Sequence, residues 1–459
     1  MATVNDVTLN KILKAALRRH HVPGATLTVL DGNRVTEAAA GVLNVDTGVP
    51  ATTDSLFQIG SITKIFTTSL VMQLVDEAKV SLDQPVRELI PWFAVADRTA
   101  TKSITLRHLM THTSGVEGDL FLDTGSGDDA TEKLLRAARF APQLYPPGER
   151  MSYCNLGFAL LGHVVHAMTG KSWDTAMRQR LFKPLGMTHA LTRPEDTLRF
   201  RCAIGHVADP AQPTVMRLSP MPWLSLGQRA AGATPMMRGA DLMRFVRMHL
   251  DGGISQTGER LLSRRSVRAM QSRQVRLSPD APRGMSHWGL GWFLGDWDGG
   301  RVFGHDGGTV GQYAFLRIHA PSRTAVALLT NGGDAGALAD DVFETTFEPM
   351  AGVHQPALPA ADPALRIAPD TVTGTYARLG GRTTVTHDGA RFWLEQTVLD
   401  PSLGFGPIPR TEIRFARRHL ARFVTENAPL ARNQVNFEGD AQGRFAFLGL
   451  GNRLSPRVA

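Results

Sequence analysis

A helix that is apolar on nearly every side is the strongest constraint in this chain. The run 59–75 places isoleucine, leucine, valine, methionine and phenylalanine around the whole helix, so the helix should be buried in a large core. Ser61 and Lys64 stand at the start of this run. Residues at i and i+3 share a face of a helix and lie within reach of each other. The sequence therefore predicts a hydroxyl and an amine side by side inside an apolar environment.

Such a pair has a chemical use. A lysine removed from water favours its neutral form, which lowers its pKa. A neutral amine beside a serine hydroxyl can take its proton and so produce an activated nucleophile. The alternative is a helix-capping serine followed by a lysine that extends to the surface. Because a lone S-x-x-K occurs often by chance, other motifs must decide between the two readings.

Composition narrows the class of protein. The 459 residues suffice for two or three domains, or for one large domain and a small one. A content of 42% hydrophobic and 20% charged residues is typical of globular proteins. The formal net charge is +8, but the arginines are scattered and form no dense basic tract. We therefore expect no nucleic-acid partner.

Cysteine content and hydropathy exclude further classes. Cys154 and Cys202 are the only cysteines, and no Cys/His cluster with metal-ligand spacing accompanies them. We therefore expect no disulfide scaffold, no metal and no cofactor. No run of 18 apolar residues occurs, and the N-terminus lacks an apolar signal segment. These features predict no membrane partner and a cytoplasmic protein.

The order of patterns along the chain predicts two domains. Residues 24–39 alternate around Asp31-Gly32-Asn33 as a hairpin does, and a second strand-rich stretch begins at 288–293 and runs to 330. Strands at both ends with helices between them favour an antiparallel sheet closed by the two ends of one α+β unit, residues 1–350. Prolines and alanines mark residues 351–369 as a linker. Short alternating runs predict an all-β barrel in residues 370–459.

A second motif lies at Tyr153-Cys154-Asn155, where another apolar helix begins. In a functional reading the phenol shares a proton with Lys64 and Ser61, and the Asn155 amide holds a substrate amide. In the alternative reading Tyr153 covers a core edge and Asn155 caps the helix.

A third motif is the glycine-rich segment that contains His305-Asp306-Gly307-Gly308. Glycines on a strand let another backbone or a ligand approach closely, and a backbone N–H there can stabilise an oxyanion. The alternative is a glycine-rich turn with an exposed histidine.

Taken together, the three motifs resemble those of the penicillin-recognising serine hydrolases. This superfamily includes class C β-lactamases, DD-peptidases, D-aminopeptidases and class VIII esterases. The resemblance covers residues 8–350 and extends to connecting segments such as 109–115 and 184–187. It implies a β-lactamase-like antiparallel sheet with a helical subdomain. The C-terminal region is similar in placement to the lipocalin-like domains of some D-amino-acid peptidases, amidases and peptide-cyclising thioesterases.

The resemblance also implies a role for each motif residue. Ser61 corresponds to the acylated nucleophile, Lys64 to its base and Tyr153 to the relay that protonates the leaving group. The N–H groups of Ser61 and Gly308 correspond to the oxyanion hole. Asn155 corresponds to the residue that orients the acyl-side amide.

His305 occupies a position where β-lactamases commonly carry lysine. A histidine is mostly neutral at pH 7 and binds a substrate carboxylate less well than a permanent cation does. This difference argues against efficient penicillin hydrolysis and favours the peptidase-like members of the superfamily.

The expected function is therefore acyl-enzyme hydrolysis of amide, peptide or ester bonds, with small peptides or amides that carry a D-residue as the favoured substrates. The alternatives are acyl transfer or peptide cyclisation by a thioesterase, a class VIII-type esterase or weak β-lactamase, and a sensor of penicillin-type ligands. The expected partner is a small-molecule or short-peptide acyl substrate, and a carrier-protein-bound acyl donor is a further alternative.

Two other features allow more than one reading. Glu117-Gly118-Asp119 could bind a substrate ammonium group, or could be a solvated acidic loop. The tryptophans at 223, 288 and 292 could line the cleft, or could belong to the core.

Overall fold

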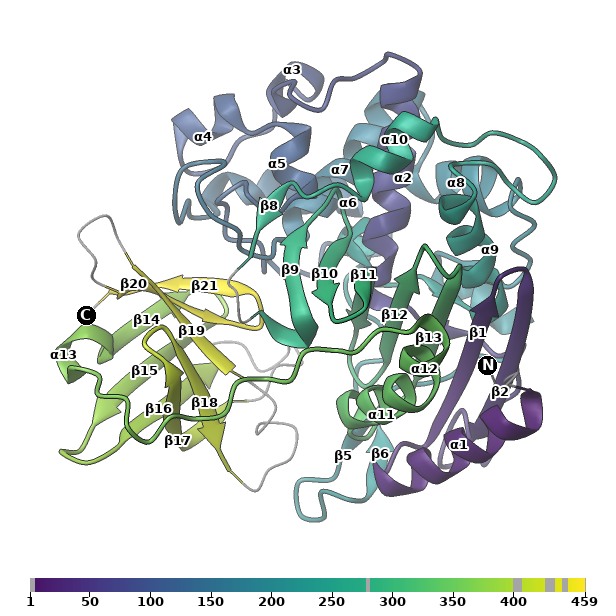
Figure 1. Cartoon of the computed structure of the whole chain (residues 1–459). Helices are drawn as coiled ribbons and strands as arrows, with labels where there is room; N and C mark the ends of the chain where they lie inside the picture. Colours follow the sequence, from purple (N-terminus) through teal and green to yellow (C-terminus); the bar gives the residue numbers. More distant parts are fainter. Residues whose placement is uncertain (1–4, 278–280, 399–406, 426–433, 440–444, 459) are drawn as a thin grey trace.

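The computed structural model describes residues 5–277, 281–398, 407–425, 434–439 and 445–458. An antiparallel sheet of eight strands, in the order β2-β1-β13-β12-β11-β10-β9-β8, forms the larger part of the molecule (Figure 1). Its strands are β1 (Gly24–Asp31), β2 (Arg34–Gly41), β8 (Val275–Arg276), β9 (Met285–Trp288), β10 (Phe293–Trp297), β11 (Gly300–Gly308), β12 (Tyr313–His319) and β13 (Thr324–Thr330). Strand β1 pairs with β2 on one side and with β13 on the other. The predicted hairpin, and the sheet closed by both ends of the unit, are confirmed.

Helices cover both faces of this sheet because its central strands are apolar on both sides. Along β13, Val326 and Leu328 pack into one core, whereas Ala325, Ala327 and Leu329 pack into the other. Successive side chains of a strand point to opposite faces, so a continuous apolar run supplies two cores. The first face is covered by α1 (Asp6–Arg19), α11 (Ala335–Val342) and α12 (Glu348–Ala351).

The other face carries the helical subdomain. Its central helix is α2 (Thr63–Asp76), in which nearly every side chain is buried, as the sequence predicts. Around it lie α3 (Val86–Leu89), α4 (Arg98–Ser103), α5 (Leu106–Met110), α6 (Ala130–Ala137), α7 (Asn155–Thr169), α8 (Trp173–Met177), α9 (Gly239–Leu250) and α10 (Arg264–Met270). Two small sheets, β3 (Phe57–Gln58) with β7 (Met236–Met237) and β4 (Ala190–Leu191), and β5 (His206–Ala208) with β6 (Met216–Leu218), complete this unit.

The predicted strand-rich stretch runs to residue 330 but begins earlier than 288, because β8 and β9 precede it. Trp288 ends β9, Phe293 starts β10, and the residues between them form a turn. The Gly289 N–H donates to the Trp292 carbonyl at 2.7 Å, which closes the turn. Alternation of tryptophan and glycine is compatible with either structure, and Gly291 adopts a φ of +79° that a strand does not allow.

The C-terminal region forms a second antiparallel sheet of eight strands in sequence order, preceded by α13 (Pro369–Val372). Its strands are β14 (Gly374–Arg378), β15 (Gly381–His387), β16 (Phe392–Val398), β17 (Ile408–Arg417), β18 (Leu420–Val424), β19 (Gln434–Gly439), β20 (Phe445–Leu450) and β21 (Arg453–Pro456). A bridge between Tyr376 and Arg457 brings the first and last strands together, so the barrel is nearly closed. The predicted α+β unit with a C-terminal all-β barrel is confirmed.

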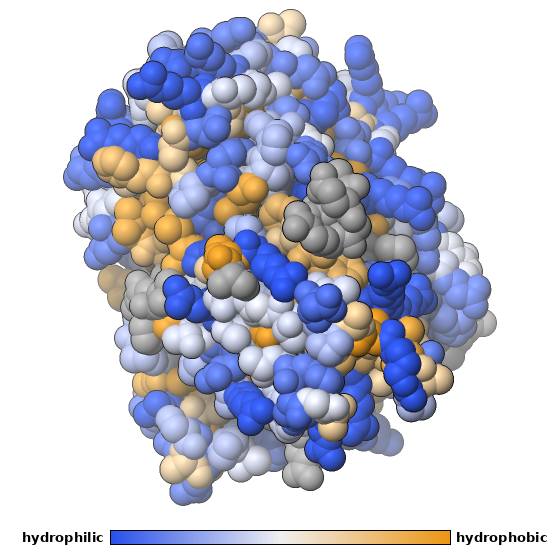
Figure 2. Space-filling model, turned by 90° about the vertical axis from the view of Figure 1, so that its left-hand side faces the viewer, coloured by the Kyte–Doolittle hydropathy of each residue, from blue (hydrophilic) through white to orange (hydrophobic). Residues whose placement is uncertain are grey.

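The barrel packs against the β8–β9 side of the larger sheet (Figure 1). The face of the molecule that carries the barrel is largely hydrophilic, with small apolar groups scattered between polar ones (Figure 2). Among the described residues, no helix is both long enough and apolar enough to cross a membrane.

Candidate active site

Ser61 and Lys64 meet at the start of α2. Ser61 lies in a single turn of 3-10 helix, Gly60–Ile62, that leads directly into α2. Lys64 is fully buried, and its Nζ lies 3.0 Å from Ser61 Oγ. Burial lowers the pKa of Lys64 well below its usual value. The alternative of a capping serine and a lysine at the surface is therefore wrong, since the lysine points inward and α2 has no side-chain cap.

Two oxygen atoms fix the orientation of the Lys64 amine. Its Nζ donates to Asn155 Oδ1 at 2.8 Å and to the Ala231 carbonyl at 2.6 Å. Both oxygens can only accept, so they take the two hydrogens of a neutral amine. In the neutral form that burial favours, the lone pair of Nζ would face the Ser61 hydroxyl and could take its proton.

Tyr153 and Asn155 reach the same place from the start of α7. The helix is capped by Cys154, whose Sγ accepts from the Gly157 N–H at 3.3 Å. The capping alternative for Asn155 is therefore wrong, and its side chain instead connects Lys64 with Asp119. The Tyr153 ring lies with its centroid 4.8 Å from Lys64 Nζ.

Burial decides the protonation state of the phenol. It raises the pKa of Tyr153, and the neighbouring Ser61 opposes this shift only in part. The ring is stacked on His112 with the two centroids 4.2 Å apart. Tyr153 is therefore a neutral phenol, able to donate or relay a proton.

The glycine-rich motif forms the end of β11, next to the nucleophile. A Cβ atom at Gly307 would lie 1.9 Å from the Ile59 carbonyl oxygen and 3.0 Å from Ser61 N. Only a glycine permits this close approach. Gly308 follows at the strand end and lines the cleft, where its backbone faces the same space as Ser61.

His305 is buried on β11, so the alternative of an exposed histidine on a turn is wrong. Its Nδ1 lies 2.6 Å from the Asp306 carbonyl and must donate to it, because a carbonyl oxygen only accepts. Burial lowers the pKa of His305 to about 4, so the ring is neutral at pH 7. Its Nε2 is therefore an acceptor, and within the described part of the chain it has no hydrogen-bond partner.

These residues line a cleft of about 610 Å³. Its polar lining residues are Ser61, Tyr153, Asn155, Gln228, His305, Asp306, Thr309, Asn452 and Arg453. The apolar side chains include Phe121, Leu224, Met285, Trp288, Phe293, Tyr313 and Phe315. Of the three tryptophans considered, Trp288 lines the cleft, Trp292 is fully buried in the core and Trp223 packs against a separate apolar cluster.

The cleft also contains residues that sequence reasoning missed. The turn between β20 and β21 contributes Gly451, Asn452 and Arg453 to its wall. The Tyr153 N–H donates to the Asn452 carbonyl at 2.8 Å, and the Arg453 guanidinium lies 5.0 Å from the Tyr153 ring centroid. No local motif marks this turn, because its partner is about 300 residues away in the chain.

Asp119 joins the barrel to the site. Its carboxylate lies 2.5 Å from both Arg378 Nη1 and Arg453 Nε, and it accepts from Asn155 Nδ2 at 3.0 Å. Burial raises the pKa of Asp119, but the two arginines outweigh that effect and hold it below its usual value. Glu117 and Asp119 are buried, so the solvated-loop reading is wrong for these two residues. Asp119 is already paired with two arginines, which leaves little capacity for a substrate ammonium group.

Metal ligation has no support within the described ranges, where no group of three or more histidine, cysteine or carboxylate side chains could hold an ion.

The chain belongs to the beta-lactamase family, whose model matches residues 9–347. Penicillin-binding protein 4 of Amycolatopsis lactamdurans is 43% identical over 373 residues, which cover 80% of this chain and 96% of that protein. The crystal structure of SurE is similar over 99% of both chains, with a TM-score of 0.79 and 29% identity. The D-amino acid amidase of Ochrobactrum anthropi SV3 shares the fold over 74% of this chain and 98% of its own, with a TM-score of 0.62 and 23% identity. The resemblance stated from the motifs is confirmed.

Proposed function

We propose that this protein is a serine acyl-enzyme hydrolase that cleaves amide bonds in small peptides or amides with a D-residue next to the scissile bond. The observation that carries the proposal is the buried Lys64 amine, whose Nζ lies 3.0 Å from Ser61 Oγ with its hydrogens directed to two carbonyl-type oxygens. An activated serine of this kind serves covalent catalysis. A pure ligand sensor would have no use for it.

Ser61 Oγ attacks the substrate carbonyl carbon, and the proton of its hydroxyl passes to Lys64 Nζ. The carbonyl oxygen becomes negatively charged and accepts hydrogen bonds from the N–H groups of Ser61 and Gly308. One such donor contributes about 3 kcal/mol of transition-state stabilisation in enzymes where it has been removed. When the carbon–nitrogen bond breaks, the Tyr153 phenol relays the proton from Lys64 to the leaving amine. Water then attacks the ester carbon of the acyl-enzyme. Its proton passes through Tyr153 and Lys64 to Ser61 Oγ, and the carboxylic acid is released.

The binding groups of the cleft favour an uncharged, partly apolar acyl portion. The Nδ2 of Asn155 has two hydrogens, of which Asp119 takes one, so the other can donate to a substrate carbonyl. The neutral His305 offers an acceptor in place of a cation. Aromatic side chains line the rest of the cleft and suit an apolar substituent.

The preference for a D-residue is supported by the similar structures. One structure of SurE, with a TM-score of 0.76 and 28% identity, contains D-Leu. A further neighbour is a D-amino acid amidase.

Acyl transfer to an amine is the second candidate, and it includes peptide cyclisation. The observation that favours it is the wall that the barrel adds, since Gly451–Arg453 line the same cleft as Ser61 together with aromatic side chains. A cleft that excludes water favours attack by a bound amine over hydrolysis. A carrier-protein-bound thioester would then be a suitable acyl donor. Ester or weak β-lactam hydrolysis has no comparable structural support.

The test is intact-mass analysis after treatment with an acylating phosphonate and, separately, with a β-lactam, on wild type and Ser61→Ala. We expect one adduct on wild type and none on the variant. An unlabelled wild type, or equal labelling of the variant, would contradict the acyl-enzyme proposal. D- and L-amino-acid p-nitroanilides, p-nitrophenyl esters and a pantetheine thioester, with and without an added amine, then separate amidase, esterase and transferase activity.

A further inference from the structure

The segment 226–233 contacts both the nucleophile and its base, and part of it lines the cleft. The Ala231 carbonyl accepts from Lys64 Nζ at 2.6 Å. A Cβ atom at Gly232 would lie 2.2 Å from the Gly60 carbonyl oxygen and 2.9 Å from Ser61 N. A shift of this segment would therefore move the amine and the nucleophile backbone together.

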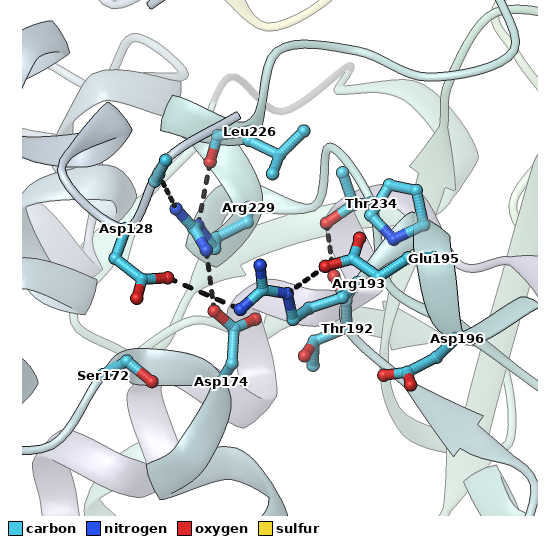
Figure 3. Close-up of polar contacts among 12 residues, drawn as sticks. Asp128, Ser172, Asp174, Thr192, Arg193, Glu195, Asp196, Leu226, Arg229 and Thr234 are labelled. Carbon is cyan, nitrogen blue, oxygen red and sulfur yellow. Dashed lines mark hydrogen bonds and ion pairs between the residues drawn. The ribbon is translucent and has the colours of Figure 1, made fainter. Parts of the chain in front are cut away.

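Arg229, which does not line the cleft, connects this segment to neighbouring elements (Figure 3). Its guanidinium makes three hydrogen bonds in three directions: to Asp174 Oδ2 at 2.7 Å, to the Leu226 carbonyl at 3.0 Å and to the Gly127 carbonyl at 3.2 Å. The side chains of Arg229 and Asp174 are only 5% and 9% exposed. The planar fork of an arginine suits this arrangement, whereas the single ammonium of a lysine cannot reach all three acceptors.

Helix α8 supplies a second tie to the same segment. Trp173 Nε1 donates to Thr67 Oγ1 at 3.2 Å, and Thr67 Oγ1 donates to the Ala230 carbonyl at 2.8 Å. Thr67 stands one turn after Lys64 on α2. Trp173 thus contacts the Ala230 carbonyl through Thr67, while its neighbour Asp174 holds the side chain of Arg229 in the same segment.

We propose that Arg229, held by Asp174, is a positioning residue that fixes the Ala231 carbonyl and through it aims the Lys64 amine at Ser61. The inference rests on the proposed acyl-enzyme function. A buried ion pair is weak evidence for stability, because desolvation offsets much of its attraction, so the pair is better explained by the precise placement that it enforces. Arg193, which lies beside it in Figure 3, pairs with Asp128 and Glu195 and has no hydrogen bond to the segment.

The experiment measures the rate of Ser61 acylation by a phosphonate against pH, in wild type, Arg229→Lys and Arg238→Lys. Arg229→Lys keeps the charge and loses the fork. We expect its plateau rate to fall by about tenfold or more, since small misplacements of reacting groups cost up to about 100-fold. We also expect its acid limb to move to lower pH. A carbonyl acceptor stabilises an ammonium more than an amine, so losing its fixed position lowers the pKa of Lys64 further.

Arg238→Lys is the matched control. It makes the same change at an ion pair with the buried Asp241, and Arg238 also contacts Thr188, which does not line the cleft. We expect it to retain the wild-type plateau and acid limb.

An acid limb that does not move in folded Arg229→Lys overturns the positioning role, whatever the rate. If that variant does not fold by circular dichroism, Asp174→Asn replaces it, because it keeps the guanidinium and weakens only its anchor. We again expect a lower plateau rate and an acid limb at lower pH. A pH–rate profile of Asp174→Asn that equals that of wild type overturns the proposal. A wild type that is not acylated at Ser61 contradicts the proposed function instead, so the two failures are distinguishable.

Discussion

At the scale of single residues, the fold places titratable groups where their charged forms are unfavourable. Lys64, His305 and the hydroxyl of the half-buried Tyr153 are buried, and in each of them burial is the main cause of a shift towards the neutral form. Neutral groups can exchange one proton around a serine without leaving an isolated charge in the core. Burying such groups lowers the free energy of unfolding by an amount that depends on pH, so the pKa shifts can be tested by measuring stability at several pH values.

Lys64→Met should slow acylation and, at neutral pH, raise the free energy of unfolding. Acylation should fall by at least about 10³-fold, equivalent to about 4 kcal/mol. At any pH between the lowered pKa of Lys64 in the folded state and its usual pKa near 10.5, Lys64 binds fewer protons in the folded state than in the unfolded state. Its contribution to stability is therefore full above pH 10.5 and is lost as the pH falls through the folded pKa. Urea unfolding should show the variant more stable than wild type at pH 7, with a smaller difference at pH 9.5. An equal difference at both pH values would contradict the lowered pKa.

His305→Gln tests the neutral histidine. The folded pKa of His305 is about 4 against a usual 6.5, so its contribution to stability is present above pH 6.5 and is lost as the pH falls through 4. We expect wild type to lose about 3 kcal/mol more than the glutamine variant between pH 7 and pH 4. Urea unfolding at the two pH values measures the difference. Parallel losses in both proteins would show that His305 does not titrate in this range.

At the scale of elements, the site depends on how closely β11 approaches the turn before α2. The backbone of Ile59 to Ser61 contacts Gly307 directly, and there is no room for a side chain between them. The end of β11 and the turn before α2 are thereby fixed to each other, together with their backbone N–H groups. Preorganised donors of this kind need no rearrangement during the reaction.

Gly307→Ala and Gly308→Ala are a matched pair for this contact. A Cβ atom at Gly307 would lie 1.9 Å from the Ile59 carbonyl oxygen, whereas one at Gly308 meets only the Tyr313 ring, at 3.5 Å. Gly307→Ala should reduce the rate of Ser61 acylation by about 100-fold, as expected for displaced reacting groups. Gly308→Ala keeps its N–H and should stay within about fivefold of wild type, since its Cβ makes only ordinary van der Waals contact. Equal rates for the two variants would show that the close approach is unimportant.

At the scale of the whole molecule, the cleft is built from two folding units. The β-lactamase-like unit supplies Ser61, Lys64 and Tyr153, and the barrel supplies Asn452 and Arg453. Asp119 links them through two buried arginine contacts, and Arg150 adds a contact to Glu438. Arg453 is positively charged and close enough to lower the pKa of Lys64. The barrel therefore contributes to the electrostatics as well as the shape of the cleft.

Arg378→Gln should loosen the barrel without touching the cleft wall. Arg378 contacts Asp119 and Glu117. A fully broken buried ion pair lowers the free energy of unfolding by about 3 to 5 kcal/mol. Because Arg453 still compensates the Asp119 charge, we expect a smaller decrease of about 2 kcal/mol. Limited proteolysis between residues 352 and 368, which form neither helix nor strand, should become faster, and acylation should slow. Arg391→Gln, at the exposed side of a pair with Glu412 within the barrel, is the control and should change neither. Unchanged proteolysis in Arg378→Gln would contradict a docking role.

The sequence alone determined the local parts of this protein. Spacing of three residues in an apolar helix is sufficient to place Ser61 beside Lys64, since helix geometry fixes that distance. Alternation and turn residues likewise predict the first hairpin and the barrel strands, because strand periodicity is a local property. The order of the three motifs was sufficient to indicate the family.

Only the tertiary structure decided which distant groups surround these parts. The Ala231 carbonyl, the Asp119–Arg378–Arg453 contacts and the Asn452 turn depend on packing between segments separated by tens to hundreds of residues. No local spacing encodes such contacts, because they follow from how whole elements and the two units fill space together. The same packing buried His305 on a strand, which excludes the alternative of an exposed turn. Burial is a property of the assembled core, and it converts the serine–lysine pair from a common pattern into a site poised for proton transfer.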